Sequence, residues 1–244
     1  RFATGSSERM RLTSTGLGIG TSSPLDKLHI DGGDINISRT ANLQTRSIKF
    51  NAHNKTTTSA EIRVTQPISG NEAGNIGFWT RPTDADGGGG LTERMLINSA
   101  GIVTMPYQPA FLYQGANGQN NIAINTSNTI SFTTGRFDNN NDFGSNTFTA
   151  PVNGRYQLNT HIRINEWDAQ AAYYQLYLVT SNRIYYQTFE GTVASGDLNY
   201  FTMNLSILAD MELGDTAIVQ IHQANGTQQS DIHNESSFSG FLAC

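Results

Sequence analysis

The alternating side chains of residues 155–164 constrain the fold of this chain more than any other feature. The apolar or small set is Tyr156, Leu158, Thr160, Ile162 and Ile164, and the polar set is Arg155, Gln157, Asn159, His161 and Arg163. Successive side chains of a β-strand point to opposite faces, so the pattern predicts a strand with one buried and one solvated face. Just before it, Pro151 lacks an N–H and Asn153-Gly154 can adopt positive φ, which predicts a tight turn into the strand.

The rest of the chain is also typical of β-structure. Charged residues make up 14% of the sequence, well below the ~25% of average globular chains, and 24 residues are glycine. No stretch keeps a helical period, whereas alternation and turn residues delimit further strands after residue 110. These strands are predicted at Tyr173–Thr180, Arg183–Glu190, Tyr200–Leu208, Ala217–His222 and Ser237–Leu242. The sequence therefore predicts an all-β protein with a β-sandwich at its C-terminal end.

Three motifs carry a resemblance to a known family. They are Phe148-Thr149-Ala150-Pro151-x-x-Gly154-x-Tyr156, Leu213-Gly214-Asp215 and the ending Phe238-Ser239-Gly240-Phe241-Leu242. In this order they resemble the globular head of complement C1q, a jelly roll related to tumour necrosis factor. The resemblance covers residues 110–244 and implies a jelly-roll head, without indicating its ligand.

Near the N-terminus, the segment Glu8–Pro24 has a shorter counterpart at Glu93–Val103. Each copy predicts two short strands joined by a turn that contains Ser-x-Gly, which is a hairpin. The string Gly16-x-Gly-Ile-Gly-Thr-Ser-Ser-Pro24, followed by Leu25–Ile30, resembles a module of phage tail fibres and related bacterial surface proteins. This resemblance covers residues 8–35 well and 91–104 more weakly.

Between the two copies, the sequence predicts short strands at Ser47–Asn51, Ala60–Thr65 and Asn75–Thr80, with loops at 51–59 and 84–90. Such thin strands bury little apolar surface by themselves. We therefore expect three parallel copies to cover their apolar sides around a common axis, as a trimeric stalk. Pro106 and Pro109 favour a boundary near 106, which gives domains 1–40 (stalk hairpin repeat), 41–105 (second stalk module) and 106–244 (head).

Several classes of function are excluded or disfavoured. The net charge is −5, and the sequence shows no basic face that would bind nucleic acid. No apolar run approaches the ~18 residues of a membrane span. Gly16-x-Gly18-x-Gly20 lacks the spacing of a dinucleotide fingerprint. The single cysteine, Cys244, cannot form an internal disulfide, so it is an inert thiol or an interchain partner. Because the chain starts at Arg1, we expect it to be a piece of a longer polypeptide.

Candidate chemistry is sparse. No Gly-x-Ser-x-Gly elbow occurs, so the sequence does not indicate a serine hydrolase. The five histidines are scattered along the chain and not spaced like zinc ligands, so we expect them to be solvated or to lie at a trimer interface. Glu166-Trp167-Asp168 places two carboxylates beside an aromatic ring, which suits sugar contact better than glycan hydrolysis. In the pairs Tyr173-Tyr174 and Tyr185-Tyr186, one ring of each pair should point into the core. The candidate ligand-binding residues are Glu166, Trp167, Asp168, Tyr173 and Tyr185.

The segment Asp138–Asp142 is rich in oxygen ligands. Carboxylates and Asn carbonyls at close spacing can hold calcium, and some members of the C1q-like family bind it. The run lacks the spacing of an EF-hand, and Asn and Asp also build turns without metal. Asp138 and Asp142 are therefore candidate calcium ligands, with a metal-free turn as the alternative.

Together, these features and resemblances predict a homotrimeric, non-enzymatic phage tail-fibre tip on the surface of the virion. Its C1q-like head would bind a host cell-surface glycan or protein receptor, while other tail proteins would join its N-terminal side. Location on a bacterial surface, or secretion, is the alternative. Two alternative functions stay open: a head that serves mainly as a trimerisation clamp, and a glycan depolymerase.

Overall fold

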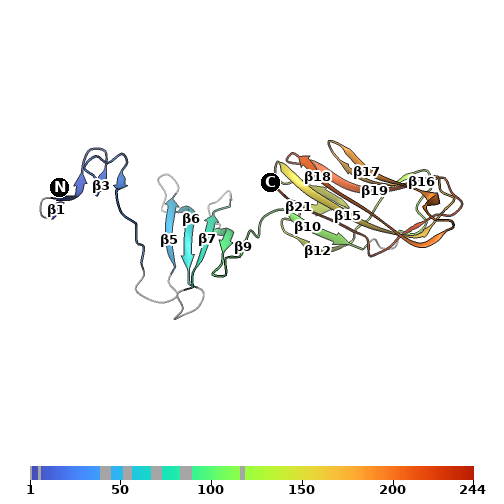
Figure 1. Ribbon diagram of the computed structural model, residues 1–244, viewed down its shortest axis with the longest axis horizontal. Coiled ribbons are helices and arrows are strands. Elements are labelled where there is room, and N and C mark those ends of the chain that lie inside the picture. The colour runs from blue at the N-terminus through green and yellow to red at the C-terminus, as the bar shows by residue number, and fades with distance from the viewer. Residues whose placement is uncertain are drawn as a thin grey trace. The chain divides into compact units, whose positions relative to one another are not determined.

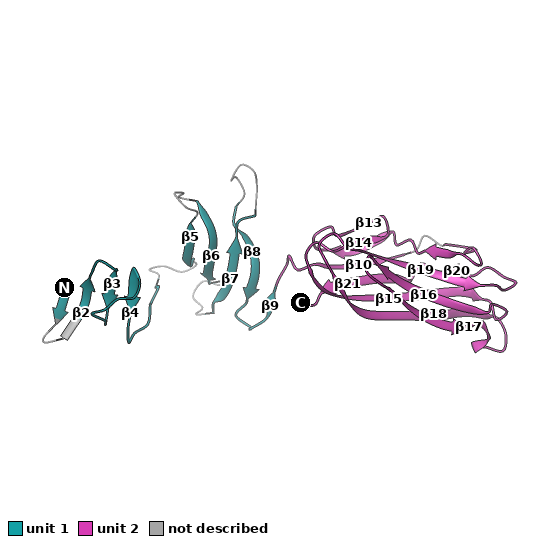
Figure 2. Cartoon of the chain, turned by 90° about the horizontal axis from the view of Figure 1, so that it is seen from above, with its two compact units in different colours: residues 1–104 teal, residues 105–244 magenta. Residues whose placement is uncertain are grey.

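The computed structural model describes residues 2–4, 7–38, 45–51, 57–66, 73–82, 90–115 and 119–244. The chain divides into two compact units, residues 1–104 and 105–244 (Figures 1 and 2). In the described part of the chain, every regular element is a β-strand except for one short 3₁₀ turn, Gly191–Val193. The predicted all-β class is therefore confirmed.

The first sheet of the N-terminal unit contains β1 (Phe2–Thr4), β2 (Ser7–Leu12), β3 (Leu17–Ile19) and β4 (Leu28–Ile30), in that order. β2 and β3 form the predicted antiparallel hairpin, and the Thr13 amide closes its turn on the Gly16 carbonyl at 3.0 Å. β4 then pairs with β3 in parallel.

The glycines of this segment allow two backbones to approach closely. A Cβ atom at Gly16 would lie 2.2 Å from the carbonyl oxygen of Asp26, and one at Gly20 would lie 2.1 Å from that of Asp31. Gly20 also has a φ of +78°, which favours glycine. The Gly-x-Gly-x-Gly run therefore serves the packing of β3 against the segment that contains β4.

The second sheet contains β5 (Arg46–Asn51), β6 (Thr58–Thr65), β7 (Asn75–Thr80), β8 (Thr92–Ile97) and β9 (Val103–Thr104). Each strand pairs antiparallel with the next, as in a meander. The three strands predicted here are present, and β8–β9 forms the second predicted hairpin. The predicted loops at 51–59 and 84–90 fall largely outside the described residues.

One side of this second sheet is apolar, and we call it the apolar face. It consists of Ile48, Phe50, Ile62, Val64, Ile76, Phe78, Met95 and Ile97, which share a side because they pair across strands or alternate along them. Ile48 is 49% exposed and Phe50 is 53% exposed. Ile48, Ile62, Val64 and Ile76 line a shallow groove of about 230 Å³. A single chain thus leaves much of this face in contact with water.

The opposite side of the sheet carries an ion pair. Arg63 Nη2 lies 2.8 Å from Glu61 Oε2, and the Arg63 guanidinium carbon lies 4.0 Å from the centre of the Trp79 ring. Glu61 is only 4% exposed. The hydrogen bond from Arg63 lowers the pKa of Glu61 below its usual value of 4.5, in opposition to the effect of desolvation.

Replacing Glu61 by glutamine should therefore destabilise the sheet in a pH-dependent way. A carboxyl whose pKa is lowered by folding stabilises the folded state above its unfolded pKa, and this contribution disappears as the pH falls through the folded pKa. We expect Glu61→Gln to lower the free energy of unfolding by about 1–3 kcal/mol at pH 7 and by much less at pH 3. Urea unfolding at both pH values, with amide exchange measured in β6, tests this. The exposed Glu212→Gln variant is the control, and equal losses at both pH values would contradict the argument.

The C-terminal unit contains two antiparallel sheets. The β15 sheet has the order β12 (Thr134–Asp138), β10 (Ala110–Gln114), β21 (Ser237–Leu242), β15 (Gly154–Trp167), β18 (Leu198–Met211), with β20 (Asp231–Ile232) paired to β15. The β16 sheet has the order β13 (Phe143–Gly144), β14 (Thr147–Thr149), β19 (Thr216–Ala224), β16 (Tyr173–Thr180), β17 (Ile184–Glu190), with β11 (Ser127–Thr129) paired to β19. The five strands predicted after residue 170 are all present.

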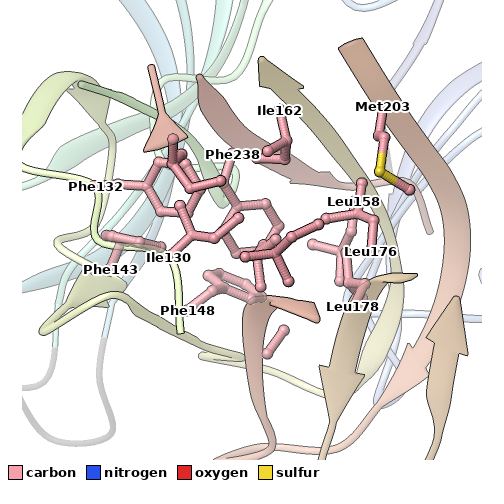
Figure 3. Packing of buried hydrophobic residues seen from close by; sticks show 14 of the residues in the cluster. Ile130, Phe132, Phe143, Phe148, Leu158, Ile162, Leu176, Leu178, Met203 and Phe238 are labelled. Atoms are coloured by element: carbon pink, nitrogen blue, oxygen red, sulfur yellow. The ribbon is translucent and has the colours of Figure 1, made fainter. Parts of the chain in front are cut away.

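The core lies between these two sheets, as Figure 3 shows for its phenylalanines and aliphatic side chains. The alternation predicted for residues 155–164 is confirmed: Tyr156, Leu158, Ile162 and Ile164 are fully buried. Phe111 joins the layers, with its ring 4.7 Å from Phe148 in a stacked arrangement. The result is a jelly-roll sandwich, as the sequence predicts.

The turn into β15 differs from the expectation in one respect. Neither Asn153 nor Gly154 adopts positive φ. Asn153 instead accepts a hydrogen bond from the Leu213 amide through its side-chain oxygen, at 2.7 Å. A Cβ at Gly154 would lie 2.8 Å from the Cys244 carbonyl oxygen. The Asn-Gly pair is therefore needed for contacts with distant segments and not for a left-handed turn.

Candidate functional site

The Glu166-Trp167-Asp168 segment ends β15, and most of it is inaccessible. Trp167 and Asp168 are 0% exposed. The Trp167 ring stacks on Tyr174 with centroids 3.8 Å apart, and its Nε1 donates to the Gly191 carbonyl at 3.0 Å. This corrects the expectation of a sugar-contacting loop, because only Glu166 reaches solvent. Glu166 has a φ of 56° and accepts a hydrogen bond from the Gln228 side chain.

Asp168 organises the surrounding loops. Its Oδ1 accepts the Gln170 amide at 2.7 Å, and its Oδ2 accepts the amides of Thr227 and Gln228 at 2.6 and 2.8 Å. A carboxylate with three backbone donors is satisfied in its buried position. Asp168 therefore has a structural role, and it does not form an accessible pair with Glu166 for glycan hydrolysis.

The tyrosine pairs divide as predicted, one ring inward and one outward. Tyr174 is fully buried, whereas Tyr173 is 37% exposed. On β17, Tyr185 packs against the core, and Tyr186 is 61% exposed. Tyr185, one of the candidate ligand-binding residues, is therefore partly buried on the core side, and Tyr186 is the exposed ring of the pair. Alternation with Leu176 and Leu178 already indicates which ring of the β16 pair turns inward.

The outward side of the β16 sheet gathers aromatic and uncharged polar side chains. We call the following set the tyrosine face: Tyr173, Gln175, Tyr177, Tyr186, Thr188, Gln220 and His222. Tyr177 on β16 is paired with Tyr186 on β17 and Gln220 on β19, while Gln175 is paired with Thr188 and His222. Of this set, only Tyr173 is among the ligand-binding residues predicted from the sequence.

Contacts within the tyrosine face hold its side chains in place. The Tyr173 ring stacks on the His222 ring with centroids 5.9 Å apart, and the ring centroids of Tyr177 and Tyr186 are 6.2 Å apart. Gln175 Nε2 donates to Thr188 Oγ1 at 3.0 Å, and its Oε1 accepts the Tyr177 hydroxyl. Desolvation, together with the neighbouring Tyr173 and Tyr186, raises the pKa of Tyr177. The Tyr177 phenol therefore stays protonated at neutral pH.

The two candidate calcium ligands lie at the end of β12 and in the following turn. Asp138 Oδ1 accepts the Asp142 amide at 2.9 Å, and its Oδ2 accepts the Phe143 amide at 3.0 Å. Burial, and then the charge of Asp138, raises the pKa of Asp142, while a hydrogen bond from Asn140 opposes the shift. Both oxygens of Asp138 thus hold the turn, so the pair does not fit calcium well. In the described part of the chain, no three His, Cys, Asp or Glu side chains gather as a metal site would require.

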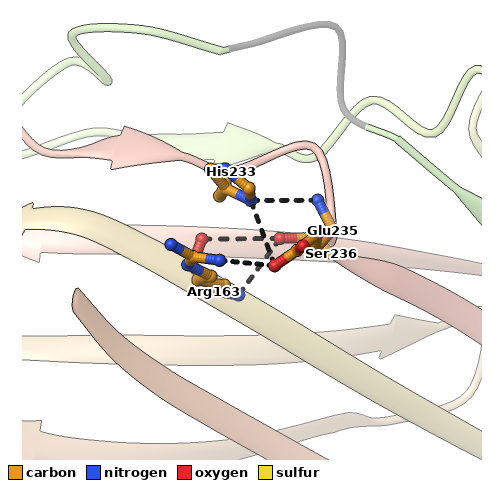
Figure 4. Close-up of polar contacts among 4 residues, drawn as sticks. All are labelled: Arg163, His233, Glu235 and Ser236. Carbon is orange, nitrogen blue, oxygen red and sulfur yellow. Dashed lines mark hydrogen bonds and ion pairs between the residues drawn. The ribbon is translucent and has the colours of Figure 1, made fainter.

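A separate polar cluster lies on the other sheet. His233, Glu235 and Ser236, from the segment between β20 and β21, converge on Arg163 of β15 (Figure 4). Arg163 forms an ion pair with Glu235, and its amide donates to Ser236 Oγ at 3.1 Å. These contacts fasten the segment to the sheet. Beside it is an open polar groove of about 530 Å³, lined by Gln114, Gly115, Thr133, Thr134, Arg136, Asn234 and Glu235.

Two further sequence expectations concern the surface. Cys244 is exposed and has a free thiol. Its pairing with another chain stays a prediction. Within the described ranges, the structure has no helix with the length and apolar character of a membrane span.

The comparisons with known proteins agree with this fold. The C1q domain model matches residues 110–243, which is more than half of the chain. The chain therefore belongs to the C1q domain family. No curated protein matches the sequence.

Two solved structures are among those that match this chain. The globular domain of zebrafish complement 1qA is 17% identical with a TM-score of 0.41, over 56% of this chain and 98% of that one. Murine APRIL is 10% identical with the same TM-score of 0.41, over 55% of this chain and 98% of that one.

Proposed function

We propose that this chain is the receptor-binding end of a homotrimeric fibre from a phage tail, and that it attaches to a host cell-surface glycan without cleaving it. The observation that carries the proposal is the combination of an uncovered apolar sheet face in residues 46–97 with a C1q domain in the same chain. The phage origin rests on the resemblance of residues 8–35 and 91–104 to tail-fibre modules.

Three copies would complete the N-terminal unit. A sheet normally buries its apolar side against a second layer. Phe50 and Phe78 on the apolar face are 53% and 38% exposed in the single chain. C1q and tumour necrosis factor domains typically self-associate into trimers, so a trimeric head would hold three copies of the N-terminal unit in one particle. We infer that the faces then cover one another.

Binding without catalysis fits the C-terminal unit. C1q-like domains are generally binding domains. Asp168 is buried and its carboxylate accepts hydrogen bonds from backbone amides. Asp168 is therefore not accessible as the second carboxylate that Glu166 would need for glycan hydrolysis. Three heads in each fibre would multiply a weak single-site affinity.

A glycan array incubated with the full chain separates the proposal from the clamp alternative. We expect the chain to assemble and to be retained on at least one related series of glycans. Retention with an unchanged glycan after incubation would also speak against a depolymerase. Assembly with no retention on any glycan would instead favour the clamp and contradict glycan recognition.

A further inference from the structure

The geometry points to the tyrosine face as a binding site for a neutral oligosaccharide. This inference rests on the proposed function, because it assigns glycan recognition to one side of the β16 sheet. β17 is the neighbour of β16 on one side in that sheet, and β19 flanks β16 on the other side. The candidate loop at Glu166–Asp168 is mostly buried, so the exposed rings of the sheet are the better platform.

The arrangement of rings suits a sugar chain. Tyr186, 61% exposed, and Tyr173, 37% exposed, expose phenol side chains to solvent. They belong to different rows of the sheet, because Tyr186 is paired with Tyr177 whereas Tyr173 is paired with Glu190. A pyranose ring has an apolar C–H side, which is attracted to the negative face of an aromatic ring. Two exposed rings in separate rows favour an oligosaccharide over a single sugar.

Polar groups lie between the rows of the two rings, at Gln175, Thr188 and His222, and in the row of Tyr186, at Gln220. Gln175, Thr188, Gln220 and His222 supply amide, hydroxyl and imidazole groups, which can both donate and accept hydrogen bonds. The Gln175–Thr188 bond of 3.0 Å and the Gln220–Thr129 bond of 3.2 Å hold two of these amides in fixed positions. Sugar hydroxyls also donate and accept, so a preorganised set of this kind loses little side-chain entropy on binding.

The charge of the surface indicates a neutral ligand. Residues 119–244 are described throughout, and the outward positions of β16, β17 and β19 there include only two ionisable residues besides tyrosine, Glu190 and His222. No lysine or arginine is among these outward positions to pair with a sulfated, phosphorylated or carboxylated sugar. An uncharged chain of hexoses or N-acetylhexosamines therefore fits better than an acidic polysaccharide.

Tyr186→Ala in the full chain tests the assignment. The matched control is Tyr200→Ala, because Tyr200 is 62% exposed, on β18 of the other sheet. The probes are immobilised neutral oligosaccharides of glucose, galactose, mannose and N-acetylhexosamines, with acidic oligosaccharides alongside. We expect Tyr186→Ala to weaken retention on the neutral series by on the order of tenfold or more, and Tyr200→Ala to leave it within about twofold. Light scattering of each variant checks that assembly is unchanged.

Other outcomes would overturn the inference. If the wild type is retained on the array and Tyr186→Ala is retained equally well, the sugar binds elsewhere on the chain and the proposed function stands. Retention on acidic oligosaccharides alone would contradict the neutral ligand. Dissociation of the assembly by Tyr186→Ala would make the face an interface between copies. If the wild type binds only a protein receptor on cells, this inference fails while the fibre assembly remains separately testable.

Discussion

Replacing Trp167 by alanine should lower the free energy of unfolding of the C-terminal unit by about 3–5 kcal/mol, since the ring is fully buried. The ring packs between Tyr174, at 3.8 Å, and Phe201, at 4.2 Å between centroids. The substitution leaves a cavity and also removes the donor to the Gly191 carbonyl. Urea unfolding at fixed protein concentration, followed by far-UV circular dichroism, measures the loss.

Leu213→Ala is the control for this effect, because Leu213 is 70% exposed in the same unit. It should change the free energy of unfolding by less than ~0.5 kcal/mol. Trp167→Phe should lie between the two, since it keeps part of the stacking but loses the hydrogen bond. A loss below ~1 kcal/mol for Trp167→Ala would show that the ring is at the surface, as the sequence first suggested.

Replacing Phe78 by aspartate should convert the assembly into single chains or into heads joined only at the C-terminal unit. Phe78 lies on the apolar face, paired with Ile62 and Met95 on the neighbouring strands. A buried carboxylate without a partner costs several kcal/mol in each copy. In a trimer this cost arises three times, which destabilises the assembly. Hydrogen exchange of the amides in β6 and β7 should rise strongly in the variant.

Lys49→Gln is the matched control, because it shifts the net charge by the same single unit. Lys49 is exposed on β5, and it alternates with Ile48 and Phe50 of the apolar face, so it points to the opposite side. It should leave both the assembly and the exchange pattern unchanged. Equal exchange in Phe78→Asp and wild type would mean that other copies do not cover this face.

Long alternating strands were the part of the fold that sequence could predict. The alternation at residues 155–164 extends into a strand of 14 residues that pairs with β18, and β16 has the predicted limits. Three strands of two or three residues in the C-terminal unit, β11, β13 and β20, were not predicted. So short a run has no periodicity of its own, and its pairing with a distant strand decides its conformation.

The candidate site was predictable only in part, for a similar reason. Two acidic neighbours make Trp167 resemble a loop residue, but contacts with Gly191 and Tyr174 bury it. Such contacts link residues far apart in sequence. The division of the tyrosine pairs followed from alternation within each strand. The grouping of Tyr173, Tyr186 and His222 required the order of strands in the sheet, which the sequence did not reveal.

The mass of the full chain in solution tests the central claim most directly. One chain has a mass of 26.6 kDa. Size-exclusion chromatography with multi-angle light scattering, over a range of dilutions, should give three times that value. A stable particle of one chain mass, with Ile48, Phe50 and Phe78 still in contact with water, would contradict the account.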